Sequence, residues 1–103
     1  MKPVHFVGSS REDLRELPES VQETAGFQLF KVQQGKEPDD WKPMTTVGAG
    51  VREIRVRDEA GAFRVIYTAQ VGDAVYVLHA FAKKTQKTTK SDLALAASRL
   101  QGI

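Results

Sequence analysis

The sequence contains no cysteine among its 103 residues. A disulfide-stabilised scaffold, a thiolate zinc site and a cysteine nucleophile are therefore excluded. The longest nearly apolar run, residues 74–82, is far too short to span a bilayer, and residues 1–6 lack the apolar core of a signal peptide. We therefore expect a cytoplasmic protein without membrane association. Its length predicts a single domain over residues 1–103 with a core of its own.

Metal ligands are also scarce. The two histidines, His5 and His79, are distant in the sequence, and neither has metal-ligand spacing around it. A glycine-rich phosphate-binding loop and a nucleophile-elbow pattern are absent too. The sequence therefore predicts neither a metal site nor a cofactor.

Charge is present but unevenly distributed. Residues 1–40 carry five Lys/Arg against eight Asp/Glu, whereas residues 41–103 carry ten against five. The acidic and basic halves have net charges of −3 and +5, although the chain as a whole is only +2. Such segregation concentrates a positive field that attracts a polyanion, or it marks no more than a solvated lysine-rich surface.

The first third of the chain has helical character after a short strand. Residues 2–7 predict the strand, and Ser9 offers a hydroxyl cap for a first helix. Pro18 can serve as the first residue of a second helix, whose apolar spacing continues to a stop at Gly35. The two helices are expected to form a hairpin.

The helical hairpin has two further features. Gly26 inside its second helix costs about 1 kcal/mol relative to alanine, so close packing against the first helix is expected there. Its larger apolar residues either leave a groove for a partner helix or belong to the core; they are Leu14, Leu17, Phe27 and Phe30.

The rest of the chain alternates with period two. Residues 36–50 predict a connecting loop tethered by Trp41 and Met44. Three antiparallel strands follow, over residues 51–57, 62–70 and 75–82, and a last helix is capped by Ser91-Asp92. The predicted fold is α+β, a small antiparallel sheet packed by the N-terminal helical hairpin and a C-terminal helix, in the order β-α-α-β-β-β-α.

The most informative segment runs from an apolar strand into a stretch with cations and no acids. His79 and Phe81 precede the cations, and Thr85, Gln86, Thr88 and Thr89 separate them. The cations are Lys83, Lys84, Lys87 and Lys90. A stacking ring, a titratable group and phosphate anchors at one strand end suit RNA.

Three segments together with the element order resemble the RelE/ParE toxin superfamily, most closely the phage-derived Gp49-like branch of HigB-type toxins. The segments are residues 50–56 (GVREIRV), 63–67 (FRVIY) and 78–88 (LHAFAKKTQKT). The last is the most specific, and the resemblance covers essentially the whole chain. Thr89 stands where this branch usually has proline.

The resemblance implies the toxin of a type II toxin–antitoxin system, an endoribonuclease (mRNA interferase) that cuts mRNA on the ribosome without a metal or cofactor. It also implies a cognate helix-turn-helix antitoxin and a higher-order toxin–antitoxin complex. The same superfamily contains gyrase-inhibiting toxins, so a ParE-like inhibitor is an alternative, as is a non-catalytic phage-derived binding remnant.

Metal-free RNA cleavage needs a base for the 2′-hydroxyl, cations for the phosphate and an acid for the leaving oxygen. The predicted catalytic residues are Lys83, Lys84, His79 and Arg55. The predicted RNA-binding residues are Arg52, Arg64, Phe81, Lys87 and Thr88. Strand alternation places Val77, His79, Phe81 and Lys83 on one face.

Each assignment has a structural alternative. His79 can be a satisfied buried imidazole, and Tyr67, an alternative proton donor, can be a core aromatic beside Phe63 and Val65. Arg55 can pair with Glu53 or Asp58, and Arg64 with an acid of the helical hairpin.

Overall fold

The computed structural model describes all residues, Met1–Ile103, as five strands and three helices. The strands are β1 (Val4–Phe6), β2 (Trp41–Pro43), β3 (Val51–Asp58), β4 (Gly61–Thr68) and β5 (Val75–Lys83). The helices are α1 (Ser10–Arg15), α2 (Glu19–Gln33) and α3 (Lys90–Gln101). The predicted α+β class is confirmed, and the element order agrees with the prediction apart from the short β2.

The five strands form one sheet in the order β1-β5-β4-β3-β2. Strands β3, β4 and β5 make the predicted antiparallel meander, and β2 lies antiparallel to β3. However, β1 runs parallel to β5, so the sheet is mixed, and the predicted antiparallel pairing holds for the other four strands. The periodicity of a strand fixes its faces but not the direction of its neighbour.

Strand β2 lies inside the segment that was predicted to be a loop. Trp41 pairs with Ile54 and Pro43 with Arg52. Because β2 is an edge strand, the missing N–H of Pro43 is tolerated there. Trp41 tethers the segment as expected, since its ring lies 3.9 Å from the Arg52 guanidinium carbon.

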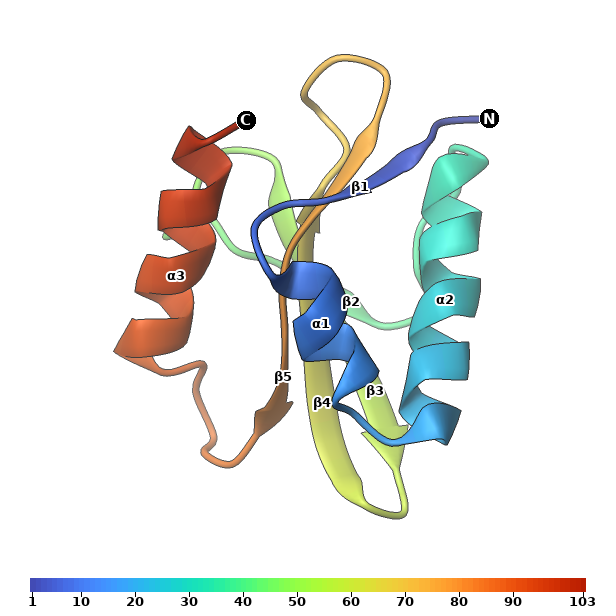
Figure 1. The fold of residues 1–103 in the computed structure, drawn as a ribbon, viewed down its shortest axis with the longest axis vertical. Helices are drawn as coiled ribbons and strands as arrows, with labels where there is room; N and C mark the ends of the chain where they lie inside the picture. Colours follow the sequence, from blue (N-terminus) through green and yellow to red (C-terminus); the bar gives the residue numbers. More distant parts are fainter.

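Helices cover both faces of the sheet (Figure 1). Helices α1 and α2 contribute Leu14, Val21 and Leu29 to the larger apolar cluster, on what we call the α2 face. Ala96 of α3 packs with Ile66 and Leu78 on the opposite side, the α3 face. The sheet is therefore the middle layer of three. None of the helices has the length and apolar character needed to cross a membrane.

The helix boundaries follow local chemistry with small shifts from the predictions. Pro18 is the residue before α2 rather than its first helical residue. Gly35, with a φ of +82°, ends α2 in the left-handed conformation that glycine adopts without penalty. Helix α3 is capped by Thr89, whose Oγ1 accepts a hydrogen bond from the Asp92 N–H at 3.2 Å, and not by Ser91.

The surface of α2 departs from the predicted close packing of the hairpin. A Cβ added to Gly26 would meet no atom within 4 Å, so the expected contact between Gly26 and α1 is wrong. Leu14 is buried in the core, whereas Phe27 and Phe30 are 57% and 43% exposed. The predicted apolar residues of the hairpin thus divide between core and surface.

The open space at Gly26 makes replacement by alanine stabilising. Gly26→Ala is expected to raise the free energy of unfolding by about 0.5–1 kcal/mol, because alanine restricts the unfolded chain and favours helix. Urea denaturation of the purified protein measures the change. Gly35→Ala is the control and is expected to lose about 1 kcal/mol at its left-handed φ. A lower stability of Gly26→Ala would contradict the packing described here.

Candidate nucleic-acid interface

Three rows of cross-strand neighbours cross β3, β4 and β5 on the α3 face. Directly opposed residues of antiparallel strands share a face, and Ile66 and Phe81 pack against the α3 cluster. The rows are Glu53, Ile66 and His79; Arg55, Arg64 and Phe81; and Arg57, Ala62 and Lys83. Lys42 of β2 extends the first row opposite Glu53. Five cations thus share this part of the face with one carboxylate.

A β-bulge in β5 sets which side chains join these rows. Ile66 pairs with His79, but the next residue, Tyr67, pairs with Val77, so Leu78 is the extra residue. Val77 therefore belongs to the α2-face cluster, while Leu78 belongs to the α3-face cluster. The prediction that Val77 shares a face with Phe81 and Lys83 is wrong for this reason.

Glu53 is the buried centre of the face. Its side chain has no exposed surface, and its Oε1 lies 3.4 Å from Nε of Arg64 and 3.9 Å from Nζ of Lys42. Its Oε2 accepts a hydrogen bond from Oγ1 of Thr88 at 2.6 Å. Arg64 therefore pairs with Glu53 and not with an acid of the helical hairpin. Burial lowers the pKa of Arg64, partly opposed by the charge of Glu53.

Arg55 and Arg57 complete the cationic side of the face. Arg55 lies 3.9 Å from Oδ1 of Asp40, an ion pair longer than a hydrogen bond, and pairs with neither Glu53 nor Asp58. Its buried Nε has no hydrogen-bond partner. Arg57 is exposed. Both guanidinium groups therefore have donors available to a ligand.

The end of β5 and the loop after it enclose a hollow of about 130 Å³. Lys83, Lys84 and Lys87 line it beside Phe81 and Asp92. Partial burial, and next the positive charge of Arg64, lower the pKa of Lys83. The sequence-predicted lysines and Phe81 are thus brought together.

The loop over residues 84–89 is held at its C-terminal end by two neighbouring threonines. Thr88 is bonded to Glu53, so this predicted RNA-binding residue also anchors the loop to β3. Thr89 Oγ1 donates to Oδ2 of Asp92 at 2.7 Å and caps α3. Lys87, directly before the two threonines, is exposed. The loop therefore presents the ammonium group of Lys87 next to an anchored end.

His79 lies between two helices, next to Phe81. Its Nε2 is 2.7 Å from Oδ1 of Asp92 in α3, and its Nδ1 is 3.5 Å from Oδ2 of Asp13 in α1. The ring stacks on Phe81 with centroids 4.7 Å apart. Arg99 holds Asp13 through a 2.9 Å hydrogen bond. His79 is buried and oriented, and one ring nitrogen, Nδ1, has no hydrogen-bond partner.

Arg52 and Tyr67, both considered as site residues from the sequence, lie on the α2 face and not on the α3 face with the other cations. Arg52 pairs with Tyr67 across β3 and β4, and Tyr67 belongs to the α2-face core with Phe63 and Val65. The structure therefore does not bring Arg52 together with Arg55 and Arg64. Tyr67 is a core aromatic, and it is separated from the lysines.

Four residues of the interface were not predicted as site residues from the sequence: Lys42, Glu53, Arg57 and Asp92. Glu53 and Arg57 could have been placed there, because each is two residues from Arg55 in a strand and therefore shares its face. Lys42 could not, because the place of β2 in the sheet depends on its pairing with β3. The contacts that Asp92 makes with His79 depend on the packing of α3, which leaves no local pattern in the sequence.

No group of three or more His, Asp or Glu side chains lies close enough to hold a metal ion. The model of the family described as phage-derived protein Gp49-like (DUF891) matches residues 12–101. Among curated proteins, none matches the chain. The match covers most of the chain and every residue of the cationic face, and the protein therefore belongs to the phage-derived Gp49-like family.

Proposed function

We propose that the protein is the toxin of a type II toxin–antitoxin system and that it cleaves mRNA on the ribosome without a metal. The observation that carries the proposal is the α3 face, where Arg55, Arg57, Arg64 and Lys83 lie next to Phe81 in two neighbouring rows, beside a single buried carboxylate, Glu53. Cations bind phosphates and an exposed aromatic ring stacks on an unpaired base. Membership of the Gp49-like family and the resemblance to RelE-type and HigB-type toxins agree with this reading.

The geometry suggests a division of roles. Arg55 and Arg64 hold the scissile phosphate, and Phe81 stacks on a neighbouring base. Lys83 removes the proton of the 2′-hydroxyl, which attacks the phosphorus, and Lys84 stabilises the charge that develops on the phosphate oxygens. Asp92 fixes the His79 ring through Nε2, and Nδ1, which has no hydrogen-bond partner, donates the proton to the leaving 5′-oxygen. The bond from phosphorus to that oxygen breaks as the bond to the 2′-oxygen forms.

A base role for Lys83 predicts the pH dependence of cleavage. Only the neutral amine accepts a proton, so the rate is expected to rise with pH, and the lowered pKa of Lys83 shifts this rise below the ordinary lysine range. Single-turnover cleavage of ribosome-bound message, measured from neutral to alkaline pH, checks this. Lys83→Arg stays charged and is expected to be slow with a flat profile. An equal rise with pH in Lys83→Arg would exclude this role.

The proposal also includes a cognate helix-turn-helix antitoxin. The exposed Phe27 and Phe30 on α2, on the side of the molecule away from α3, are a suitable contact for an apolar partner. An antitoxin bound there leaves the cationic face free for a second contact. An antitoxin that contacts both α2 and the cationic face fits a higher-order toxin–antitoxin complex.

The direct test is expression in cells with 5′-end mapping by primer extension. A translated reporter is compared with the same reporter lacking its start codon. New 5′ ends within codons of the translated message alone are the expected result. Growth arrest without such ends would replace the proposal with gyrase inhibition or another binding function, and no arrest would indicate an inactive remnant.

A further inference from the structure

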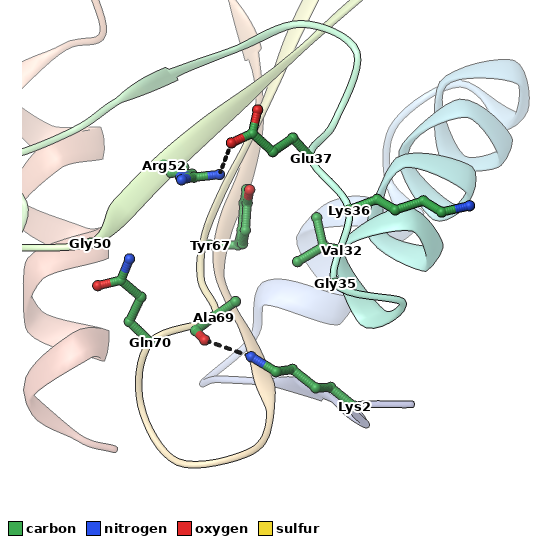
Figure 2. Close-up of a pocket in the computed structure, with 10 residues that line it drawn as sticks. All are labelled: Lys2, Val32, Gly35, Lys36, Glu37, Gly50, Arg52, Tyr67, Ala69 and Gln70. Carbon is green, nitrogen blue, oxygen red and sulfur yellow. Dashed lines mark hydrogen bonds and ion pairs between the residues drawn. The ribbon is translucent and has the colours of Figure 1, made fainter.

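A second cavity, of about 220 Å³, lies on the α2 face at the opposite side of the sheet from the cationic interface (Figure 2). It forms where the end of α2, the start of β3 and the end of β4 meet the N-terminal segment. Arg52, Tyr67 and Lys2 supply its principal hydrogen-bond donors, and Glu37 supplies its one carboxylate. None of these groups takes part in the proposed cleavage of RNA.

Tyr67 gives the cavity an unpaired buried donor. The side chain is 1% exposed, and its hydroxyl has no hydrogen-bond partner. Burial raises the pKa of Tyr67, partly opposed by the neighbouring Arg52 guanidinium, so the hydroxyl keeps its proton. Figure 2 shows it pointing toward Arg52 and Glu37. Buried polar groups are nearly always hydrogen-bonded, so this orphan donor indicates a missing acceptor.

Arg52 lines the cavity beside the Tyr67 hydroxyl, and its guanidinium group is held in place by Trp41. Its guanidinium carbon lies 3.9 Å from the Trp41 ring centroid, a cation–π contact. The nearest carboxylate, Oε1 of Glu37, is 3.8 Å from Nη1, beyond hydrogen-bond distance, and the Glu37 side chain is 65% exposed. The guanidinium is therefore positioned by the indole and weakly neutralised by a carboxylate that can move away.

Lys2 adds a second cation on another side of the cavity. Its ammonium donates one hydrogen bond to the carbonyl of Ala69 at 3.0 Å, which fixes it and leaves its other N–H groups free. Lys36 also borders the cavity, but Figure 2 shows its ammonium extending away from the other groups. The positive charge available to a ligand in the cavity is therefore that of Arg52 and Lys2.

We propose that this cavity binds a phosphate monoester group, held by Arg52, Lys2 and the Tyr67 hydroxyl. Two fixed cations that line one cavity match the two negative charges of a phosphate monoester. Its terminal oxygens are acceptors for the Tyr67 hydroxyl and the Arg52 guanidinium, while the Lys2 ammonium adds the second charge from another side of the cavity. A carboxylate offers one charge and two oxygens, and Glu37 already provides such a group. The phosphate belongs either to a free nucleotide or to the end of an RNA chain.

Calorimetric titration of the full chain with inorganic phosphate at constant ionic strength tests the site. We expect saturable binding at one site that weakens about tenfold or more in Tyr67→Phe, the usual effect of losing a hydrogen bond to a charged group. Arg52→Gln should weaken it as strongly. Arg11→Gln, which removes an exposed cation of α1, should leave it unchanged.

Tyr67→Phe keeps the buried ring and removes only the orphan hydroxyl. Its thermal unfolding temperature without phosphate should therefore match or exceed that of the wild type, while the rise caused by phosphate should be reduced. Equal phosphate binding by wild type and Tyr67→Phe, or no binding by either, would overturn the proposal.

The source of the phosphate is distinguished with two further probes. Tighter binding of a nucleoside 5′-monophosphate than of an RNA oligonucleotide with a terminal phosphate supports the free nucleotide. The reverse order, with loss of the advantage when the terminal phosphate is removed, supports an RNA end. Because these titrations do not involve cleavage, their results are independent of whether the protein is a nuclease.

Discussion

Simultaneous replacement of Lys83 and Lys84 by alanine is expected to abolish mRNA cleavage and translation arrest while leaving the protein folded. Loss of a general base costs about 10²–10⁴ in rate, and loss of one group that stabilises transition-state charge costs about 10²–10³. The combined effect should therefore be about a thousandfold or more. Single-turnover cleavage and translation arrest measure it.

The fold should tolerate this double substitution because of where the two lysines lie. Lys83 is the last residue of β5, and Lys84 is an exposed residue of the following loop. Neither side chain contributes to either apolar cluster. Circular dichroism and urea denaturation of Lys83→Ala/Lys84→Ala should consequently match the wild type.

A control must separate the loss of these two groups from the loss of two positive charges. Arg11→Ala/Arg15→Ala also removes two exposed cations, from α1, and should retain cleavage. If the lysine variant is folded and as toxic as the wild type, the assigned site is wrong. If the arginine control is equally inactive, only the total charge matters and the lysines have no special role.

Much of the fold could be predicted because most elements are long enough to show their periodicity. Strands β3, β4 and β5 each have eight or nine residues, and their alternation was visible in the sequence. Strand β2 has three residues, including a lysine and a proline, so it shows no period. Its place in the sheet depends on pairing with β3, which is a tertiary contact.

The same alternation explains where the prediction of the interface succeeded and failed. Arg55 lies on one face of β3 with Glu53 and Arg57, as a count of two residues along a strand requires, so the same count could have added Glu53 to the predicted site. Arg52 is three residues from Arg55, so alternation in a regular strand already puts it on the other face, as observed. The bulge at Leu78 could not be predicted in this way, because no glycine or proline near it interrupts the strand pattern in the sequence.

The largest expected loss of stability comes from the buried carboxylate beneath this interface. Glu53→Ala should lower the free energy of unfolding by about 3–5 kcal/mol, because removing one partner of a buried ion pair leaves the other charge uncompensated. Arg64 would be that charge, since its side chain is 8% exposed and its Nε lies 3.4 Å from Oε1 of Glu53. Thr88 would also lose its acceptor. Urea denaturation measures the change.

Comparison with an exposed carboxylate shows whether this loss comes from burial of the charge. Glu59→Ala removes an exposed carboxylate from the turn between β3 and β4 and should change stability by no more than about 0.5 kcal/mol. A similar small effect for Glu53→Ala would mean that the pair with Arg64 is not formed in solution.

The double variant Glu53→Leu/Arg64→Leu separates stability from function. Replacing a buried ion pair with apolar side chains is often neutral or stabilising, so this variant should recover most of the loss seen for Glu53→Ala. Cleavage should nevertheless stay low, because the loop after β5 loses its anchor at Thr88 and the phosphate loses Arg64. Recovery of both stability and cleavage would show that Arg64 is only a structural partner of Glu53. Recovery of stability alone would mean that the pair is kept for RNA cleavage rather than for folding.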